Sequence, residues 1–244
     1  MSPNGTPAEE MRPIKLEADI LRHAEGSARI HMGDTVVLCA ATVEDRVPMW
    51  RKGSGKGWIT AEYGMLPRCS ADRIRREAVR GQQTGRTQEI QRLIGRSLRS
   101  VTDLSSLGER TIILDCDVLE ADGGTRTASV TGACVALHMA LSYLVRQERI
   151  AYHPMRDLVG AVSVGIVGGK PTLDLCYAED SRAQVDMNVV MTGRGGYVEV
   201  QGTGEEAPFE HDELMRMLDL AKSGLDQVFR VQREVLQIPE GQRA

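Results

Sequence analysis

Two patterns of hydrophobic and polar positions stand out along the chain. Residues 35–43, TVVLCAATV, are almost continuously apolar, which is typical of a strand buried on both faces of a sheet. From Thr87 onward, apolar side chains recur at helical spacing and so share one face of a helix. They are Ile90, Leu93, Ile94, Leu98 and Val101.

The same two patterns predict the remaining elements. Glycine-rich turns at 33–34, 168–169 and 193–196 predict hairpins between neighbouring strands. Strands, helices, strands and a final helix follow one another, which favours an α+β fold over alternating βαβ units. Further strands are expected at 28–31, 58–63, 111–119, 158–167, 172–177, 185–191 and 197–201, and further helices from 125 to about 145 and from 211 to 237.

Local composition divides the chain into three parts. Residues 1–12 are polar and are expected to form a flexible N-terminus. His153-Pro154 lies between a predicted helix and the next strand and marks a boundary. We therefore predict an N-terminal domain at 13–150 and a C-terminal domain at 151–244.

Composition narrows the class of protein. Hydrophobic residues make up 41% of the chain and charged residues 26%, as in ordinary globular domains. No uninterrupted apolar run approaches the roughly 20 residues of a membrane span, and the N-terminus lacks the apolar segment of a signal peptide. Five cysteines without a CxxC pair fit neither a disulfide framework nor a zinc finger. We therefore expect a cytoplasmic protein with reduced thiols.

Charge is distributed unevenly along the chain. The net charge is −4, yet residues 46–99 contain 13 basic and four acidic residues and carry a net charge of +9. The rest of the chain then carries −13. This asymmetry predicts a basic surface for anions such as RNA.

Glycines 123 and 124, in the segment DGGTRT, lie between a predicted strand and a predicted helix. Backbone amides at the helix start, together with Arg126, would bind a phosphate. Alternatively, the segment is a tight turn in which Asp122 or Thr125 caps the helix. Gly85-Arg86-Thr87 presents a similar choice between an anion site and a solvated basic helix.

Three acids, Glu179, Asp180 and Asp186, fall within eight residues. Carboxylates suit Mg²⁺, which phosphoryl chemistry often needs, but ordinary surface acids would show the same spacing. Asp180 and Asp186 can meet if residues 181–185 form a turn. The loop 53–57, GSGKG, lacks the spacing of a Walker loop, so it is either a plain surface loop or a contact to RNA backbone.

Ordered blocks along the chain resemble the ribonuclease PH family of phosphate-dependent 3′-exoribonucleases. The resemblance runs from about Arg12 to the end of the C-terminal helix. Its most specific block is ADGGTRTAS at 121–129. Further matching blocks lie at 23–27, 57–68, 85–87, 89–94, 114–119, 179–181, 186–191 and 199–203.

The resemblance implies a ribosomal-protein-S5 domain-2-like α+β fold assembled as a homohexameric ring, a trimer of dimers. It implies that Asp180 and Asp186 are the essential acidic pair beside Mg²⁺. The residues it implies for inorganic phosphate are Arg86, Gly124, Thr125 and Arg126, and those for tRNA are Arg68, Arg73 and Arg76.

The implied activity is that of a tRNA nucleotidyltransferase. Phosphate attacks the terminal phosphodiester of a tRNA precursor beyond the 3′-CCA end and releases a nucleoside diphosphate, and diphosphates extend RNA in reverse. One alternative is a catalytic subunit of an exosome-like hetero-oligomeric ring. Another is a non-catalytic RNA-binding ring subunit, which we would expect to lack the phosphate-binding arginines or the acids that are present here.

Overall fold

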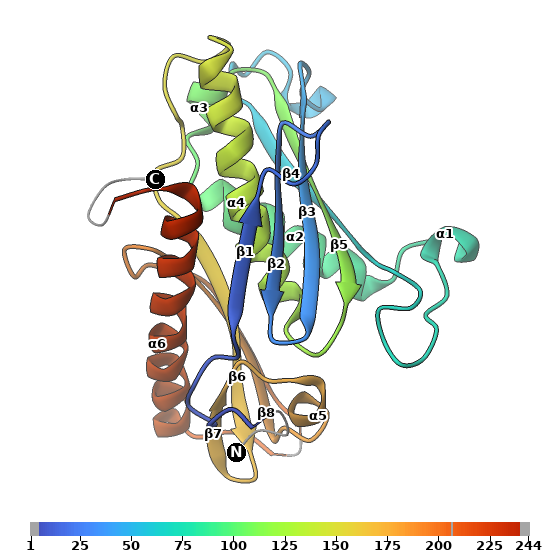
Figure 1. Ribbon diagram of the computed structural model, residues 1–244, viewed down its shortest axis with the longest axis vertical. Helices are drawn as coiled ribbons and strands as arrows, with labels where there is room; N and C mark the ends of the chain where they lie inside the picture. The colour runs from blue at the N-terminus through green and yellow to red at the C-terminus, as the bar shows by residue number, and fades with distance from the viewer. Residues whose placement is uncertain (1–4, 206, 240–244) are drawn as a thin grey trace.

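The computed structural model describes residues 5–205 and 207–239, which form two β-sheets packed with helices (Figure 1). The first sheet has the strand order β1-β2-β3-β5-β4, in which all neighbours are antiparallel except the parallel pair β4 and β5. Its strands are β1 (Ile14–Ala18), β2 (Gly26–Met32), β3 (Thr35–Glu44), β4 (Trp58–Met65) and β5 (Thr111–Glu120).

The second sheet is antiparallel throughout, with the order β7-β6-β8-β9. Its strands are β6 (Val159–Val167), β7 (Lys170–Leu173), β8 (Val185–Thr192) and β9 (Tyr197–Gly204). The helices are α1 (Glu77–Arg80), α2 (Gly85–Ser100), α3 (Leu104–Leu107), α4 (Thr125–Arg146), α5 (Tyr177–Asp180) and α6 (His211–Leu236), with a 3-10 turn η1 (Met49–Arg51).

Helix α4 packs against both sheets and forms the centre of the core. Because it is apolar nearly all round, it is buried rather than amphipathic. By length and composition it is the one helix in the described part of the chain that could cross a membrane, yet 72% of that window is buried inside the molecule. Because α4 contacts both sheets, its N-terminus lies where the two sheets meet.

The strongly patterned elements match their predicted positions. The strand predicted at 35–43 is β3, and the stripe predicted from Thr87 is the buried face of α2. The hairpin predicted at 33–34 joins β2 to β3, and that at 168–169 joins β6 to β7. The α+β order is confirmed, with one mixed and one antiparallel sheet.

Three local predictions are wrong. No strand was expected at 14–18, where β1 forms. The strand expected at 172–177 ends at Leu173, because Asp174 adopts a left-handed φ of 52° and the chain turns into α5. The expected flexible terminus of 1–12 does not extend to Met11 and Arg12, which are buried; residues 1–4 lie outside the described residues.

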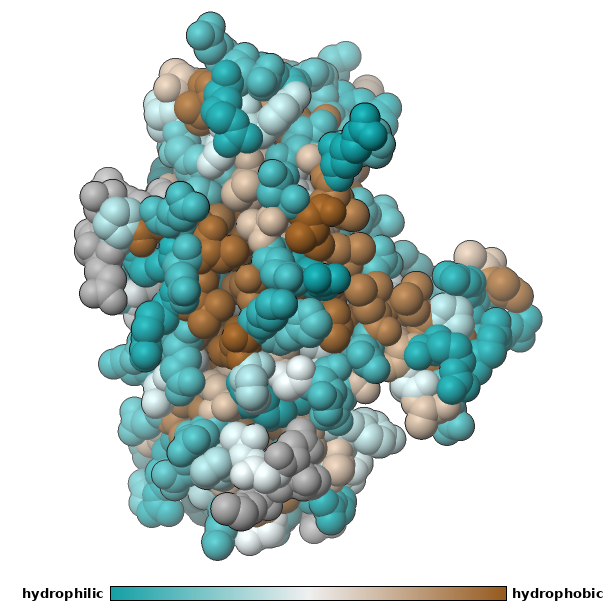
Figure 2. All heavy atoms as spheres, viewed as in Figure 1, coloured by the Kyte–Doolittle hydropathy of each residue, from teal (hydrophilic) through white to brown (hydrophobic). Residues whose placement is uncertain are grey.

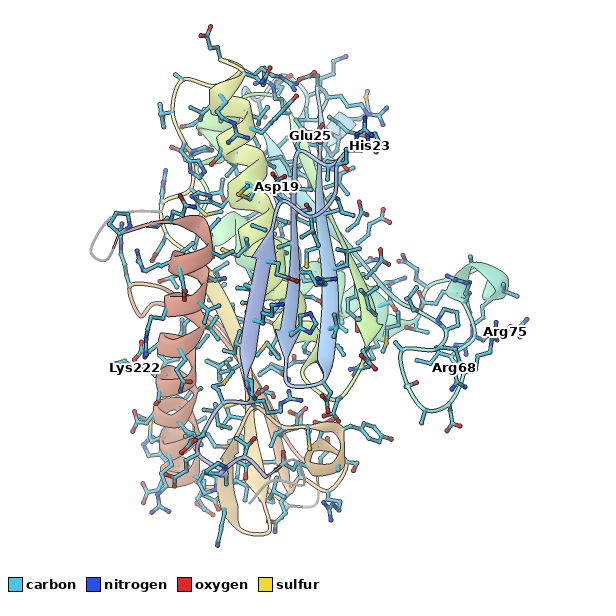
Figure 3. The ribbon with its side chains drawn as sticks, in the orientation of Figure 1. Asp19, His23, Glu25, Arg68, Arg75 and Lys222 are labelled. Carbon is cyan, nitrogen blue, oxygen red and sulfur yellow. The ribbon has the colours of Figure 1, made fainter. Side chains whose placement is uncertain are left out.

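Between β4 and α2 the chain leaves the body of the molecule as a long excursion, residues 66–84, which we call the arginine loop (Figure 1). Figure 3 shows Arg68 and Arg75 projecting from it, on the opposite side of the molecule from Lys222 of α6. Its arginines are all exposed: Arg68, Arg73, Arg75, Arg76 and Arg80.

Candidate active site

One small cavity collects most of the residues that the sequence singled out. Its volume is about 40 Å³, room for roughly three water molecules, and thus for a small anion rather than a nucleotide. It lies where α2, α4, α5, β6 and β8 meet. Its lining is Arg86, Gly124, Thr125, Arg126, Ser163, Asp180, Asp186 and Asn188.

The N-terminus of α4 opens into this cavity. Gly124 is the N-cap residue, with a left-handed φ of 65°, and no side chain caps the helix. Asp122 accepts a hydrogen bond from the backbone N–H of Tyr177, and the alternative interpretation, a turn in which Asp122 or Thr125 caps the helix, is not found. An uncapped N-terminus offers free N–H groups and a partial positive charge, which favour an anion.

Gly123 allows the two halves of the molecule to meet beside this helix start. Its φ is 75°, which favours glycine. A Cβ atom here would overlap the carbonyl oxygen of Leu175 and lie 2.8 Å from the carbonyl carbon of Cys176. The glycine therefore lets the turn before α4 contact the backbone that leads into α5.

Arg126 brings a positioned cation to the cavity. Its side chain is 14% exposed, and its Nη1 lies 3.5 Å from Oε1 of Glu89 and 3.2 Å from Oε1 of Gln201. Thr125, one residue earlier, shares a 2.9 Å hydrogen bond with the hydroxyl of Tyr63. Burial raises the pKa of Tyr63, while the fields of Arg86 and Arg126 act in the opposite direction.

Arg86 is the second residue of α2 and is exposed at the cavity. The start of this helix is fixed by Thr84, whose hydroxyl accepts from the N–H of Thr87. The hydroxyls of Thr84 and Thr87 both donate to Oε1 of Glu77, at 2.8 and 2.7 Å. Arg86 therefore projects from an anchored helix terminus.

Asp180 and Asp186 approach each other across the turn between α5 and β8. Burial raises the pKa of Asp186, and repulsion from the Asp180 carboxylate raises it further, against the opposing field of Arg126. A nearby cation would stabilise the ionised form of both carboxylates. The Nε of Arg182, in the same turn, donates to the carbonyl of Ala178 at 2.8 Å.

The two carboxylates fit Mg²⁺, which often uses one or two protein carboxylates and keeps waters or substrate phosphates as its other ligands. A dedicated protein cage is a poorer fit, since no group of three His, Cys, Asp or Glu able to hold a metal occurs within residues 5–205 and 207–239. The site therefore suits a metal bound together with phosphate.

Three residues predicted to contact tRNA lie elsewhere. Arg68, Arg73 and Arg76 are on the arginine loop and do not line the cavity. Sequence reasoning also missed two residues that do line it, Ser163 and Asn188. Asn188 follows Asp186 at the two-residue spacing of a strand face, which is the pattern that could have revealed it.

Comparisons with known proteins agree with this fold. Residues 10–141 match domain 1 of the 3′ exoribonuclease family, and residues 157–224 match domain 2. The structure is similar to that of rice (Oryza sativa) Rrp46, with 20% identity, a TM-score of 0.78, and coverage of 96% of this chain and 99% of that one.

Two exosome structures are also similar in fold. An archaeal exosome core matches with 21% identity and a TM-score of 0.74, covering 96% of this chain and 90% of its own. The Archaeoglobus fulgidus exosome with RNA bound to the active site matches with 21% identity and a TM-score of 0.77, covering 97% and 92%. The two domain matches span most of the sequence and confirm the resemblance seen in its motifs, so this chain belongs to the 3′ exoribonuclease family of RNase PH.

Proposed function

We propose that the chain is a phosphorolytic 3′–5′ exoribonuclease. The observation that carries this proposal is the lining of one small cavity by an uncapped helix N-terminus, two arginines and two carboxylates. The positive groups suit inorganic phosphate, and the carboxylates suit a metal that offsets charge on the reacting phosphates. A non-catalytic ring subunit would not need both the phosphate-binding positive groups and the metal-binding carboxylates.

The reaction needs positioning and charge neutralisation rather than a protein nucleophile. An oxygen of the bound phosphate attacks the phosphorus of the terminal phosphodiester. The bond from that phosphorus to the 3′-oxygen of the preceding nucleotide breaks, and a proton passes to this oxygen. The products are a nucleoside 5′-diphosphate and RNA shorter by one nucleotide, so the reverse reaction extends RNA.

Each part of the cavity has a role in this scheme. Arg86, Arg126 and the amides at 124–126 would hold the attacking phosphate. Asp180 and Asp186 would hold Mg²⁺, which when bound supplies positive charge for the phosphoryl oxygens. Gln201 and Glu89 keep the Arg126 side chain over the cavity.

The substrate we propose is the 3′ end of structured RNA, with tRNA precursors as the first candidate. The arginine loop provides five exposed cations away from the cavity, so it can hold the body of an RNA while its 3′ end enters the site. Contacts of this kind are mostly to phosphates and are sensitive to salt.

Two assemblies fit this activity. Two of the similar solved structures are exosome structures, which favours a subunit of an exosome-like, hetero-oligomeric ring over a self-assembling tRNA-trimming enzyme. Figure 2 shows apolar side chains gathered over the strands of the first sheet, on a face that a ring neighbour could cover. The mass of the purified chain separates the two: a homohexamer supports the tRNA enzyme, and a monomer or dimer supports the exosome-like subunit.

One assay tests the activity itself. The purified chain is incubated with a 3′-extended tRNA and Mg²⁺, with and without inorganic phosphate, and the released nucleotides are identified. Nucleoside diphosphates that form only with phosphate support the proposal. Monophosphates released without phosphate would make the protein a hydrolase and would remove the role assigned to Arg86 and Arg126.

A further inference from the structure

Asn188 lines the cavity with a carboxamide that the folded chain leaves unused. The residue is 7% exposed and shares the cavity with the arginines and carboxylates already described. Within the described part of the chain, no protein group hydrogen-bonds its side chain, and its amide atoms are not among the enclosed, unpaired polar atoms, which belong to His138, His153 and Gln232. The carboxamide is therefore open to the cavity, where a bound ligand can replace the water that it contacts.

The sheet register explains where this side chain points. Asn188 lies on β8, opposite Ser163 of β6 and Gln201 of β9. Side chains directly opposite one another project from the same face of a sheet, and so does Asp186, two residues earlier. Asn188 therefore lies among groups that face the N-terminus of α4.

The neighbours of Asn188 already have partners within the protein. Oγ of Ser163 accepts from the N–H of Leu175 at 3.0 Å. Oε1 of Gln201 accepts from Nη1 of Arg126 at 3.2 Å. Because no neighbour fixes the orientation of the Asn188 amide, its NH₂ group is free to turn toward whatever occupies the cavity.

We propose that Asn188 is a phosphate-binding residue whose Nδ2 donates a hydrogen bond to an oxygen of the bound inorganic phosphate; this rests on the proposed function. A cavity with room for about three waters brings any phosphate into contact with its lining. Beside an anion, the amide presents its N–H because its carbonyl oxygen would be repelled. Asn188 thus adds a neutral carboxamide donor beside the two charged donors of the site, Arg86 and Arg126.

The competing role is that of a metal ligand through Oδ1, and two substitutions separate the roles. Asn188→Asp keeps the shape but replaces the donor with a negative charge. If the residue donates to phosphate, this change weakens phosphate binding. If it binds Mg²⁺, the added carboxylate tightens metal binding. Asn188→Leu removes all polar atoms at similar volume.

The experiment measures binding of inorganic phosphate alone by equilibrium dialysis with labelled phosphate, and binding of Mg²⁺ by calorimetry, on the full chain. We expect Asn188→Leu to weaken phosphate binding about tenfold or more, and Asn188→Asp to weaken it further. Half-saturation by Mg²⁺ should be unchanged in Asn188→Leu. Met187→Leu, a volume-conserving change in the same strand, controls for disturbed packing and should bind phosphate as the wild type does.

Two outcomes overturn the inference. One is wild-type phosphate affinity in folded Asn188→Leu; the other is tighter Mg²⁺ binding with unchanged phosphate affinity in Asn188→Asp. If Asn188→Leu does not fold, the isosteric Asn188→Asp decides alone. In either case a wild-type chain that still releases nucleoside diphosphates keeps the proposed function. A wild type that releases none and binds no phosphate ends both proposals.

Discussion

The guanidinium of Arg12 and the carboxylate of Asp174 form a buried, two-pronged ion pair. Nε donates to Oδ2 at 2.9 Å and Nη2 to Oδ1 at 2.7 Å, with side-chain exposures of 2% and 0%. Nη1 of Arg12 also donates to the carbonyl of Asp122 at 2.6 Å. The Arg12 side chain thus ties the N-terminal segment to the turn before α4 and to the segment before α5. Helices α4 and α5 both contribute residues to the lining of the cavity.

Asp174→Asn should be strongly destabilising. Asparagine keeps the shape and tolerates the left-handed backbone, but it leaves the Arg12 cation buried without its main counter-charge. Breaking one partner of a buried pair costs about 3–5 kcal/mol. Urea unfolding checks this. Glu17→Gln, which breaks a half-exposed contact with Arg29, is the matched control and should shift the midpoint far less. A similar midpoint for Asp174→Asn and wild type would contradict the assigned role of the pair.

The elements that the sequence predicts well are those whose burial is encoded locally. The apolar run of β3 and the helical stripe of α2 each determine their own buried face, because a side chain's neighbours along the element decide whether it can be solvated. Both elements form where the pattern places them, within two residues at each end.

The parts that could not be predicted depend on contacts distant in the sequence. Arg12 and Asp174 are 162 residues apart, and no local pattern links them. Their pairing draws Asp174 out of the predicted strand, which is why β7 ends early and α5 begins. The motifs identified Arg126 and Asp186 as candidates. Strand spacing puts Asn188 on the same face as Asp186, but the pairing with Ser163 of β6 is needed to place that face at the cavity.

Gly123→Ala should cost more stability than Gly81→Ala. Both glycines have a φ of 75°, so alanine meets the same backbone strain, about 1–2 kcal/mol, at either position. Only at Gly123 does the added Cβ also collide with backbone, that of Leu175 and Cys176, whereas nothing lies within 4 Å at Gly81. Chemical denaturation of both variants measures the difference. Equal losses would show that the turn before α4 shifts freely.

Asp186→Asn should stabilise the metal-free protein at neutral pH. Burial, and then Asp180, raises the pKa of Asp186 in the folded state, so the ionised carboxylate opposes folding above that pKa. The variant should therefore melt at a higher temperature than wild type at pH 7 in the presence of a chelator. The difference should shrink as the pH falls through the raised pKa, because wild-type Asp186 is then protonated.

Mg²⁺ at millimolar concentration should also narrow this difference at pH 7, by stabilising wild type more than the variant. Asp226→Asn, at an exposed position of α6, serves as the control. Its melting temperature should differ from that of wild type by the same amount at pH 7 and at a pH below the raised pKa of Asp186. A lower melting temperature for Asp186→Asn than for wild type at pH 7 without metal would show that the ionised Asp186 carboxylate does not destabilise the folded protein.

Arg126→Ala and Asp186→Asn should affect different kinetic quantities. Arg126→Ala removes a charge-assisted contact worth about 1.5–3 kcal/mol, part of which should appear as weaker saturation by phosphate. Asp186→Asn should lower turnover in both degradation and diphosphate-driven synthesis, since both cross one transition state. Arg96→Ala, which removes a cation paired with Glu199 outside the cavity, is the control for charge. Near-normal turnover of Asp186→Asn at saturating phosphate and Mg²⁺ would exclude its proposed role.

RNA binding should depend on the arginine loop rather than on total charge. The triple variant Arg68→Ala, Arg73→Ala and Arg76→Ala removes three exposed cations from one projecting segment (Figure 3). Removing one cation that neutralises an RNA phosphate flattens the slope of log affinity against log salt by about 0.7–0.9, so the slope should be flatter by about 2–3 in the triple variant.

The matched control for the arginine loop removes three exposed cations outside it, through Lys170→Ala, Arg216→Ala and Lys222→Ala. It changes the net charge equally but leaves the loop intact, so its salt slope should remain that of wild type. Filter binding of tRNA at four salt concentrations gives all three slopes. Degradation of a short RNA should suffer less in the loop variant, because a short RNA reaches fewer of these arginines. Equal slopes for the loop variant and wild type would place the RNA body on another surface.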